Sequence, residues 1–165
     1  MNEQVCTKAV DTCGYPVETT GNAVLDTLEH RSSTRAFARD DDDRPVAVTD
    51  EQRAAILHAA SRAPSAGAMM MYSIVSIREQ ATLDRLADLC DHQPFIAGAP
   101  LVLVFLADCR RWLNAYHAAG ITDARKPGAG DLMLAMADTC IAAQNAVVAA
   151  ESFGIGSCYI GDIME

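Results

Sequence analysis

Positive charge is scarce in this sequence. Its 165 residues include 13 lysines and arginines against 22 aspartates and glutamates, which gives a formal net charge of −9 at pH 7. Proteins that bind nucleic acid without sequence preference do so through a basic patch that neutralises phosphates. The charge balance therefore excludes that class and disfavours attachment to an anionic membrane surface. A phosphate bound by this chain must be met locally by a few arginines.

Several common motifs of catalysis are also missing. The sequence has no GxSxG motif of a serine hydrolase, and its four histidines lack the spacing of a zinc peptidase helix. The glycine pair in GIGSCYIG (154–161) follows an expected helix, whereas the loop that binds a dinucleotide opens one. We expect no catalytic side chain and no metal site, so a cofactor would have to supply any enzymatic chemistry.

The cysteines and the N-terminus indicate the compartment. None of the six cysteines forms a CxxC pair, so free thiols in a reducing cytoplasm are expected. The role of Cys6 and Cys13 stays open. The first residues lack a basic stretch followed by an apolar one, so no secretory signal is expected and the predicted location is cytoplasmic. Residues 1–20 carry Gly14 and Pro16 and read as a mobile extension before one domain at 21–165.

Hydrophobic periodicity predicts helices alternating with a few strands. Helices are expected from Asn22, at 49–63 with Thr49 and Gln52 in a capping box, and at 79–91, 110–120 and 131–153. Strands are expected at 71–77, at 100–108 with both faces buried, and at 154–163. The acidic run 40–43 predicts a solvated loop, since it lacks the alternating ligands and glycine of a calcium site. What that loop does stays open.

The helix at 131–153 is apolar almost all the way round, so we expect it to be buried between other layers. A membrane span is the rival interpretation. Asp138, Gln144 and Asn145 inside the helix, and the absence of flanking basic residues, disfavour it. The sequence stops at Glu165, directly after an expected strand. This predicts a shortened chain or one whose sheet edge another chain covers.

The stretch HRSSTRAF (30–37) brackets hydroxyl side chains between two arginines. A guanidinium fork and neighbouring hydroxyls suit a phosphate or carboxylate. Arginine near the C-terminus of a helix is equally typical of a favourable interaction with the helix dipole. From these residues alone both an anion cradle and a polar helix end remain open.

Three sequence segments, taken in order along the chain, favour the anion cradle over the polar helix end. RSSTRAF (31–37), ASRAPSAGAMMMYSIVSI (60–77) and GDLMLAMADTCIAAQNAVVAAESFGIGSCYIGDI (130–163) together resemble the flavin-dependent nitroreductase family. The last segment is similar to the branch of NAD(P)H-dependent, oxygen-insensitive nitroreductases and flavin reductases. The resemblance runs from Ala23 to the C-terminus. It implies an α+β fold, with a small, mostly antiparallel sheet wrapped by helices, in an intertwined homodimer with FMN at the interface.

The resemblance also assigns residues to the cofactor. The phosphate and nearby ribityl oxygens would be held by Arg31, Ser32, Ser33 and Arg35. The flavin ring would pass the loop of Pro64, Ser65 and Ala66, and its reactive edge would meet backbone amides at Tyr159, Ile160, Gly161 and Asp162. For Gly154 and Gly156 we expect only the termination of the preceding helix. At 69–72 this chain has MMMY where many relatives carry a polar residue or tryptophan, so methionine packing is expected there.

The implied reaction is a ping-pong transfer of hydride from NAD(P)H to FMN and then to a nitroaromatic, quinone or similar acceptor. The choice between NADH and NADPH, and the physiological acceptor, stay open. A flavin-binding protein or remnant without turnover is the alternative, because the family's usual C-terminal portion is absent from the sequence. Other flavin reactions, such as reductive dehalogenation, are a further alternative within the same fold.

Overall fold

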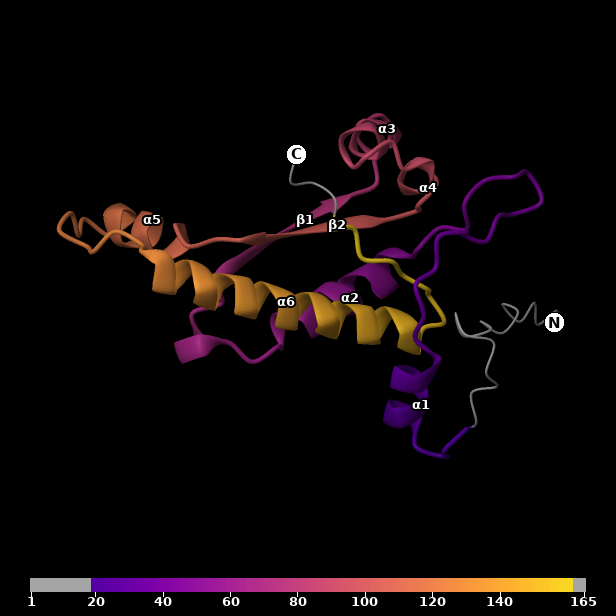
Figure 1. Ribbon diagram of the computed structural model, residues 1–165, viewed down its shortest axis with the longest axis horizontal. Helices are drawn as coiled ribbons and strands as arrows, with labels where there is room; N and C mark the ends of the chain where they lie inside the picture. Colours follow the sequence, from indigo (N-terminus) through magenta and orange to yellow (C-terminus); the bar gives the residue numbers. More distant parts are fainter. Residues whose placement is uncertain (1–18, 162–165) are drawn as a thin grey trace.

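The computed structural model describes residues 19–161 (Figure 1). The predictions for residues 1–18, including Cys6 and Cys13, and for Asp162 lie outside the described residues. The elements in chain order are α1 (Ala23–His30), α2 (Asp50–Ser61), the 3-10 turn η1 (Ala66–Ala68), β1 (Tyr72–Ile77), α3 (Gln80–Leu89), α4 (Pro94–Ala97), β2 (Val102–Ala107), α5 (Arg111–Ala118) and α6 (Ala129–Ser152).

Local sequence signals explain where the first helices begin. The Asn22 side chain caps α1 by accepting hydrogen bonds from the amides of Val24 and Leu25. At α2 the predicted capping box is present. The Gln52 amide donates to Thr49 Oγ1 at 3.2 Å, and the Thr49 amide donates to Gln52 Oε1 at 3.0 Å. Both helix starts are therefore confirmed.

In the described residues the sheet has two antiparallel strands, β1 and β2, with Tyr72 opposite Ala107 and Ile77 opposite Val102. The expected burial of β2 on both faces is wrong. Ile74, Leu103 and Phe105 pack toward the core, whereas Val75 and Leu106 are each 45% exposed. Side chains alternate across a strand, so in this two-stranded sheet one face packs on helices and the other stays partly open.

The strand expected at 154–163 is also not formed in the part of it that is described. There the chain makes a single parallel bridge, between Ser157 and Ser33. Its neighbour is the irregular stretch after α1 and not a sheet strand, so the pairing stops after one bridge. The GIGSCYIG segment is therefore joined to RSSTRAF and does not extend the sheet.

The main core lies where α6 crosses α2 beneath the sheet (Figure 1). Ile56 and Ala60 of α2 meet Ala146 and Ala150 of α6, and side chains of both strands pack against this cluster. Small alanines at the contact let the two helix axes come close together. A second cluster joins α3 to α4 through Ala87, Cys90 and Ile96.

The expectation that α6 is buried all round is wrong. One stripe is buried, and it consists of Ala135, Asp138, Ala142, Ala143, Ala146 and Ala150. On other faces Met133 is 73% exposed and Met136 54% exposed. A single chain offers partners for one face of this apolar helix, and the rest of its apolar surface is left without cover.

Among the described residues, α6 is the one helix long and apolar enough to cross a membrane. Length and composition alone are weak evidence of a span, since the central helices of water-soluble folds share both properties. The buried stripe of α6 contacts α2 and both strands. It also carries the buried carboxylate of Asp138. These contacts are those of a helix in the core of a domain.

Candidate functional site

Two of the sequence segments singled out above lie side by side at the C-terminal end of α6. We call them the Arg31–Arg35 segment and the Gly154–Gly161 segment. The amide of Thr34 donates to the carbonyl of Ser157 at 2.9 Å. A Cβ atom added to Gly156 would lie 2.9 Å from the Cβ of Thr34, closer than side chains can approach. Glycine at 156 is therefore what allows the two segments to touch.

This contact corrects the expectation for the two glycines. Gly154 has a φ of +72° and its amide donates to the Glu151 carbonyl at 2.8 Å, so it ends α6 as predicted. Gly156 has a different role, because it makes room for Thr34. A pattern of two glycines after a helix does not distinguish a terminator from a close approach.

The charges around Arg31 come from three elements. Burial raises the pKa of the Glu151 carboxyl on α6, and Arg31 and His30 partly oppose that rise. Burial and Cys140 raise the pKa of the Tyr159 hydroxyl, and Arg31 opposes that rise too. The Oε2 atom of Glu151 is buried and finds no hydrogen-bond partner among the described residues. Arg31 therefore lies near one acidic group that has room for a further donor.

Arg35 contacts a different part of the fold. Its guanidinium carbon lies 5.8 Å from the centroid of the Phe95 ring on α4, within the range of a cation–π interaction. Ile160 packs against the same α3–α4 cluster. Arg35 itself is exposed. The two arginines of the predicted cradle thus leave the Arg31–Arg35 segment toward different neighbours, with exposed Ser33 between them.

Of the predicted ring-facing residues, Ser65 and Ala66 belong to a second group, the Ser65–Met71 loop between α2 and β1, and exposed Pro64 directly precedes that loop. Within it Gly67, Ala68 and Met70 have positive φ values of 59°, 54° and 48°. Left-handed backbone at a residue other than glycine costs about 1–3 kcal/mol and persists only where surrounding contacts hold it. The loop is therefore a strained segment that needs external support.

That support comes from a buried carboxylate. Asp138 on α6 is 3% exposed. Its Oδ1 accepts from the Ala66 amide at 3.1 Å and its Oδ2 accepts from the Met71 amide at 3.2 Å. Inside the loop, Ser65 Oγ accepts from the Met70 amide at 2.7 Å. One side chain thus fixes both ends of the strained stretch.

Two residues of α5 hold the loop from the other side. The indole N–H of Trp112 donates to the Met69 carbonyl at 2.8 Å. Arg111 donates to the carbonyls of Met70 and Tyr72 at 3.1 and 3.2 Å. No pattern in the sequence predicts these contacts. The one signal for Asp138 is a carboxylate inside an apolar helix, which by itself argues only against a membrane span.

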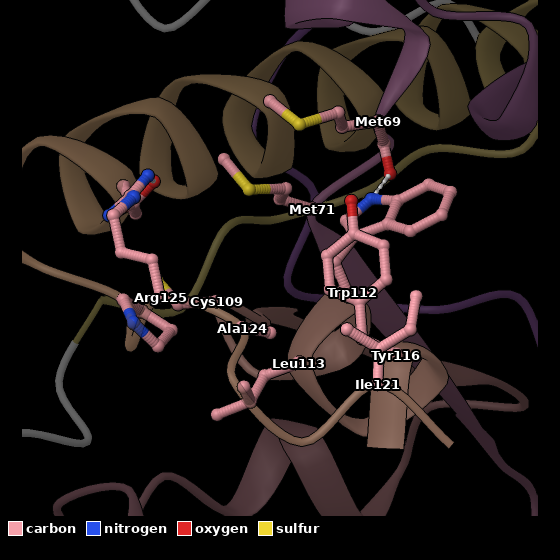
Figure 2. A pocket seen from close by; sticks show the side chains of 11 residues that line it. Met69, Met71, Cys109, Trp112, Leu113, Tyr116, Ile121, Ala124 and Arg125 are labelled. Carbon is pink, nitrogen blue, oxygen red and sulfur yellow. Dashed lines mark hydrogen bonds and ion pairs between the residues drawn. The ribbon is translucent and has the colours of Figure 1, made fainter. Parts of the chain in front are cut away.

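A cavity of about 360 Å³ lies between the loop and α5. Figure 2 shows Met69 and Met71 on one side, with Trp112 and Tyr116 across from them. The two aromatic rings have centroids 6.0 Å apart. Met69 and Met71 therefore form an apolar wall of the cavity, and methionine packing in place of a polar contact to the flavin stays a prediction.

An ion pair closes one end of this cavity. Arg125 donates to both carboxylate oxygens of Asp131, at 2.6 and 2.8 Å. The Arg125 guanidinium, with the Gly128 amide, holds the pKa of Asp131 well below its usual range. The pair fixes the chain before α6 and leaves the rest of the lining mainly apolar.

The two groups of predicted site residues are not brought together within one chain. The Ser65–Met71 loop is attached at Asp138 near the middle of α6, and the Arg31–Arg35 segment lies near Glu151 at its C-terminal end (Figure 1). At 1.5 Å rise per residue these two positions are roughly 20 Å apart along the helix. The Gly154–Gly161 segment runs between these positions. Ser157 pairs with Ser33, whereas the Tyr159 hydroxyl donates to Gln144 Oε1 on α6 at 3.3 Å and Ile160 packs on the α3–α4 cluster.

The arrangement of helices and strands defines the fold class of this protein. It is an α+β domain in which a small antiparallel sheet packs on a central alanine-rich helix. The chain belongs to the nitroreductase family, whose model matches residues 28–165. The resemblance seen in the three sequence segments is thereby confirmed, and with it the nitroreductase-like fold.

Individual relatives support the same assignment. The oxygen-insensitive NADPH nitroreductase of Salmonella typhimurium (strain LT2) is 39% identical over 116 residues, covering 70% of this chain and 46% of that protein. The NADPH-flavin oxidoreductase of Vibrio harveyi is 32% identical over 142 residues, covering 86% of this chain and 54% of that protein. The solved structure of B. megaterium NfrA2 matches with a TM-score of 0.77 at 29% identity, over 86% of this chain and 55% of that one. The chain spans about half the length of these relatives.

Proposed function

We propose that this chain is the FMN-binding part of an NAD(P)H-dependent oxidoreductase. It would pass hydride from NAD(P)H to nitroaromatic, quinone or similar acceptors in a ping-pong cycle. The observation that carries the proposal is the contact between the Arg31–Arg35 and Gly154–Gly161 segments, because the family resemblance assigns both segments to FMN. The names of the relatives, a nitroreductase and a flavin oxidoreductase, support the same chemistry.

The donor set suits a terminal phosphate. A phosphomonoester carries close to two negative charges and several acceptor oxygens, which favour guanidinium and hydroxyl donors. Arg31, Ser32, Ser33 and Arg35 would hold that group, in a protein that is otherwise acidic. Tyr159, Ile160, Gly161 and Asp162 would follow the flavin toward its reactive edge, with backbone amides as the donors.

The loop residues would orient the ring. Pro64, Ser65 and Ala66 have small side chains, so the backbone of the Ser65–Met71 loop can approach a flat surface closely. FMN, when bound, supplies the hydride-transfer chemistry, and the protein positions the ring and excludes water. No side chain of this chain is assigned a proton-transfer role.

We infer that the FMN site forms between two copies of the chain. Asp138, which holds the Ser65–Met71 loop, and Glu151, which lies near Arg31, are roughly 20 Å apart along α6. In the proposed site one copy contributes the Arg31–Arg35 segment and its partner the Ser65–Met71 loop. The exposed apolar side chains of α6, including Met133 and Met136, give a second copy an apolar surface to cover. The proposed assembly is an intertwined homodimer of a water-soluble, cytoplasmic protein that binds neither nucleic acid nor membrane.

One observation favours a second candidate, a flavin-fold protein without turnover. The Glu151 carboxylate lies near Arg31 and would face a bound phosphate, which like-charge repulsion opposes. The spectrum of the purified protein separates a working reductase from this alternative.

The test is the visible absorption spectrum of the purified chain before and after anaerobic NADPH. The proposal expects a flavin spectrum that bleaches on reduction and is largely lost in an Arg31→Ala/Arg35→Ala variant. Arg85→Ala is the control, because Arg85 is an exposed arginine on α3. A flavin that binds but does not bleach would favour the candidate without turnover. A protein that takes up no added FMN would contradict the reductase and favour a remnant that cannot retain the cofactor.

A further inference from the structure

Asp138 stands apart from the other acidic residues that the structure describes. Among those residues it is the one charged side chain that is buried. Its two carboxylate oxygens accept hydrogen bonds from two backbone amides of one loop. The amides belong to Ala66 and Met71, which flank the three residues with positive φ. A carboxylate placed this way closes the Ser65–Met71 loop as a clamp would.

The sequence positions show that this is a long-range arrangement. Asp138 lies in the middle of α6, and the loop precedes β1. Ala135 and Ala142, one turn away on either side of Asp138, are each 0% exposed. The carboxylate is therefore held by the packed stripe of α6, and its position is fixed by the core and not by the loop that it binds.

Loss of these two hydrogen bonds would let the loop relax. Left-handed Ala68 and Met70 are each disfavoured on their own, so the loop without its clamp would move toward ordinary backbone angles. Met69 and Met71 would move with it, and these two side chains form one wall of the cavity in Figure 2. The shape of the ring-facing loop and of the cavity wall thus depends on one residue of α6.

We propose that Asp138 is a positioning residue that holds the Ser65–Met71 loop in the shape in which it receives the flavin ring. This rests on the proposed function, since it assumes that the loop faces FMN. Asp138 touches neither the cofactor nor a reacting atom in this account. It acts through the amides of Ala66 and Met71.

The chain carries its own reporter for this loop. Trp112 is the one tryptophan in the sequence, and its indole N–H donates to the Met69 carbonyl inside the loop. Its fluorescence therefore reports the loop conformation without any ligand. Hydrogen exchange at the amides of Ala66 and Met71 reports the two clamped bonds directly.

The experiment compares the full chain with Asp138→Asn, which keeps the size of the side chain and replaces one acceptor oxygen with a donor. In the apo protein we expect faster exchange at Ala66 and Met71 and a changed Trp112 emission. FMN affinity should fall about ten- to a hundredfold, because the bound state must re-form the loop without a charge-assisted hydrogen bond. The visible spectrum of the flavin that still binds should also shift, because the loop that contacts the ring is less ordered.

Two further variants keep the test decisive. Asp88→Asn makes the same chemical change at a side chain that is 78% exposed on α3, and should leave every readout unchanged. Ser65→Ala removes only the bond to the Met70 amide, so it should give a smaller shift in the same direction in a protein that still folds. If Asp138→Asn does not fold, exchange in the native chain decides, and exchange at the Ala66 and Met71 amides as fast as in an unstructured peptide overturns the proposal.

The remaining outcomes separate the proposal from the function on which it rests. Unchanged exchange and emission in a folded Asp138→Asn variant would overturn the clamp. A loosened loop with unchanged FMN affinity would overturn its role toward the flavin. If the native chain takes up no FMN, the proposed function fails, and so does the role toward the flavin. Faster exchange in Asp138→Asn would then still support the clamp itself.

Discussion

The two groups of candidate site residues are held in place by different means. At the C-terminal end of α6, the Arg31–Arg35 segment is joined to the Gly154–Gly161 segment by backbone contact and by the absence of a side chain at Gly156. Nearer the middle of α6, the Ser65–Met71 loop is held by the buried side chain of Asp138. The first group is recognisable as a sequence motif. The second depends on a residue far away in the chain.

This difference teaches where each group is vulnerable. A pairing made by backbone atoms tolerates most side-chain changes and fails when a side chain is added at the contact. A loop held by one carboxylate tolerates changes within the loop and fails when the carboxylate is removed. Substitutions that exploit this contrast should break one group and leave the other intact.

The largest effect is expected for Asp138→Ala. Removal of the carboxylate leaves the buried amide of Met71 and the partly buried amide of Ala66 without an acceptor, which costs up to about 1–3 kcal/mol for each group. Some of that loss is recovered as the loop relaxes, so unfolding in urea should show a decrease of about 2–4 kcal/mol. Asp88→Ala, at an exposed position, should stay within about 0.5 kcal/mol of the native protein. Equal stability of the two variants would contradict the clamp.

A smaller effect is expected for Gly156→Ala, which attacks the other group. The added Cβ would overlap Thr34, and overpacking of this kind costs about 1–3 kcal/mol. Gly130→Ala is the matched control. Nothing lies within 4 Å of a Cβ at that helical position, so alanine should stabilise the protein by up to about 1 kcal/mol. Thermal unfolding that shifts in the same direction for both variants would argue against the close approach.

Trp112→Phe should have a milder effect on the loop. It removes the indole N–H that donates to Met69 and keeps most of the aromatic surface, so the expected loss is about 1 kcal/mol. Hydrogen exchange should accelerate within the Ser65–Met71 loop and not in the Arg31–Arg35 segment. Tyr116→Phe, which changes the neighbouring ring without touching the loop, should leave exchange as it is. Faster exchange in both segments would contradict the view that the two groups are held in place independently.

The smallest effect concerns Glu151 and pH. Because burial raises the pKa of Glu151 above its ordinary value of 4.5, the folded state binds this proton more tightly than the unfolded state. The resulting loss of stability is absent below pH 4.5, grows as the pH rises toward the folded-state pKa, and is complete above it. Glu151→Gln should therefore gain in melting temperature over the native protein as the pH rises through that window. A difference that is constant with pH would show that Glu151 titrates normally.

Local signals made much of the fold predictable. The capping box at Thr49 and Gln52 located the start of α2. Alternating β-branched residues located β1, and a continuous apolar run located β2, each within one or two residues. The three quoted segments identified the family. These features depend on residues close together in sequence, where propensity and side-chain pattern act directly.

The misjudged features all depend on long-range packing. An apolar composition cannot show that α6 finds partners on one face only, because that depends on how many layers a single chain supplies. The Gly154–Gly161 segment reads as a strand, but its neighbour in space is an irregular segment. Asp138 accepts hydrogen bonds from amides 72 and 67 residues earlier in the chain, in the loop before β1, and no local sequence pattern predicts such a contact.

The most direct test of the account mixes the two broken groups in one dimer. A heterodimer of an Arg31→Ala/Arg35→Ala copy and an Asp138→Asn copy is purified through two different tags, and its bound FMN is measured. If each site takes its phosphate group from one copy and its loop from the other, one site in the heterodimer is intact. The FMN content should then be about half that of the native dimer, although each variant alone binds little. A heterodimer as empty as the two variants would place both groups in the same copy and contradict the shared site.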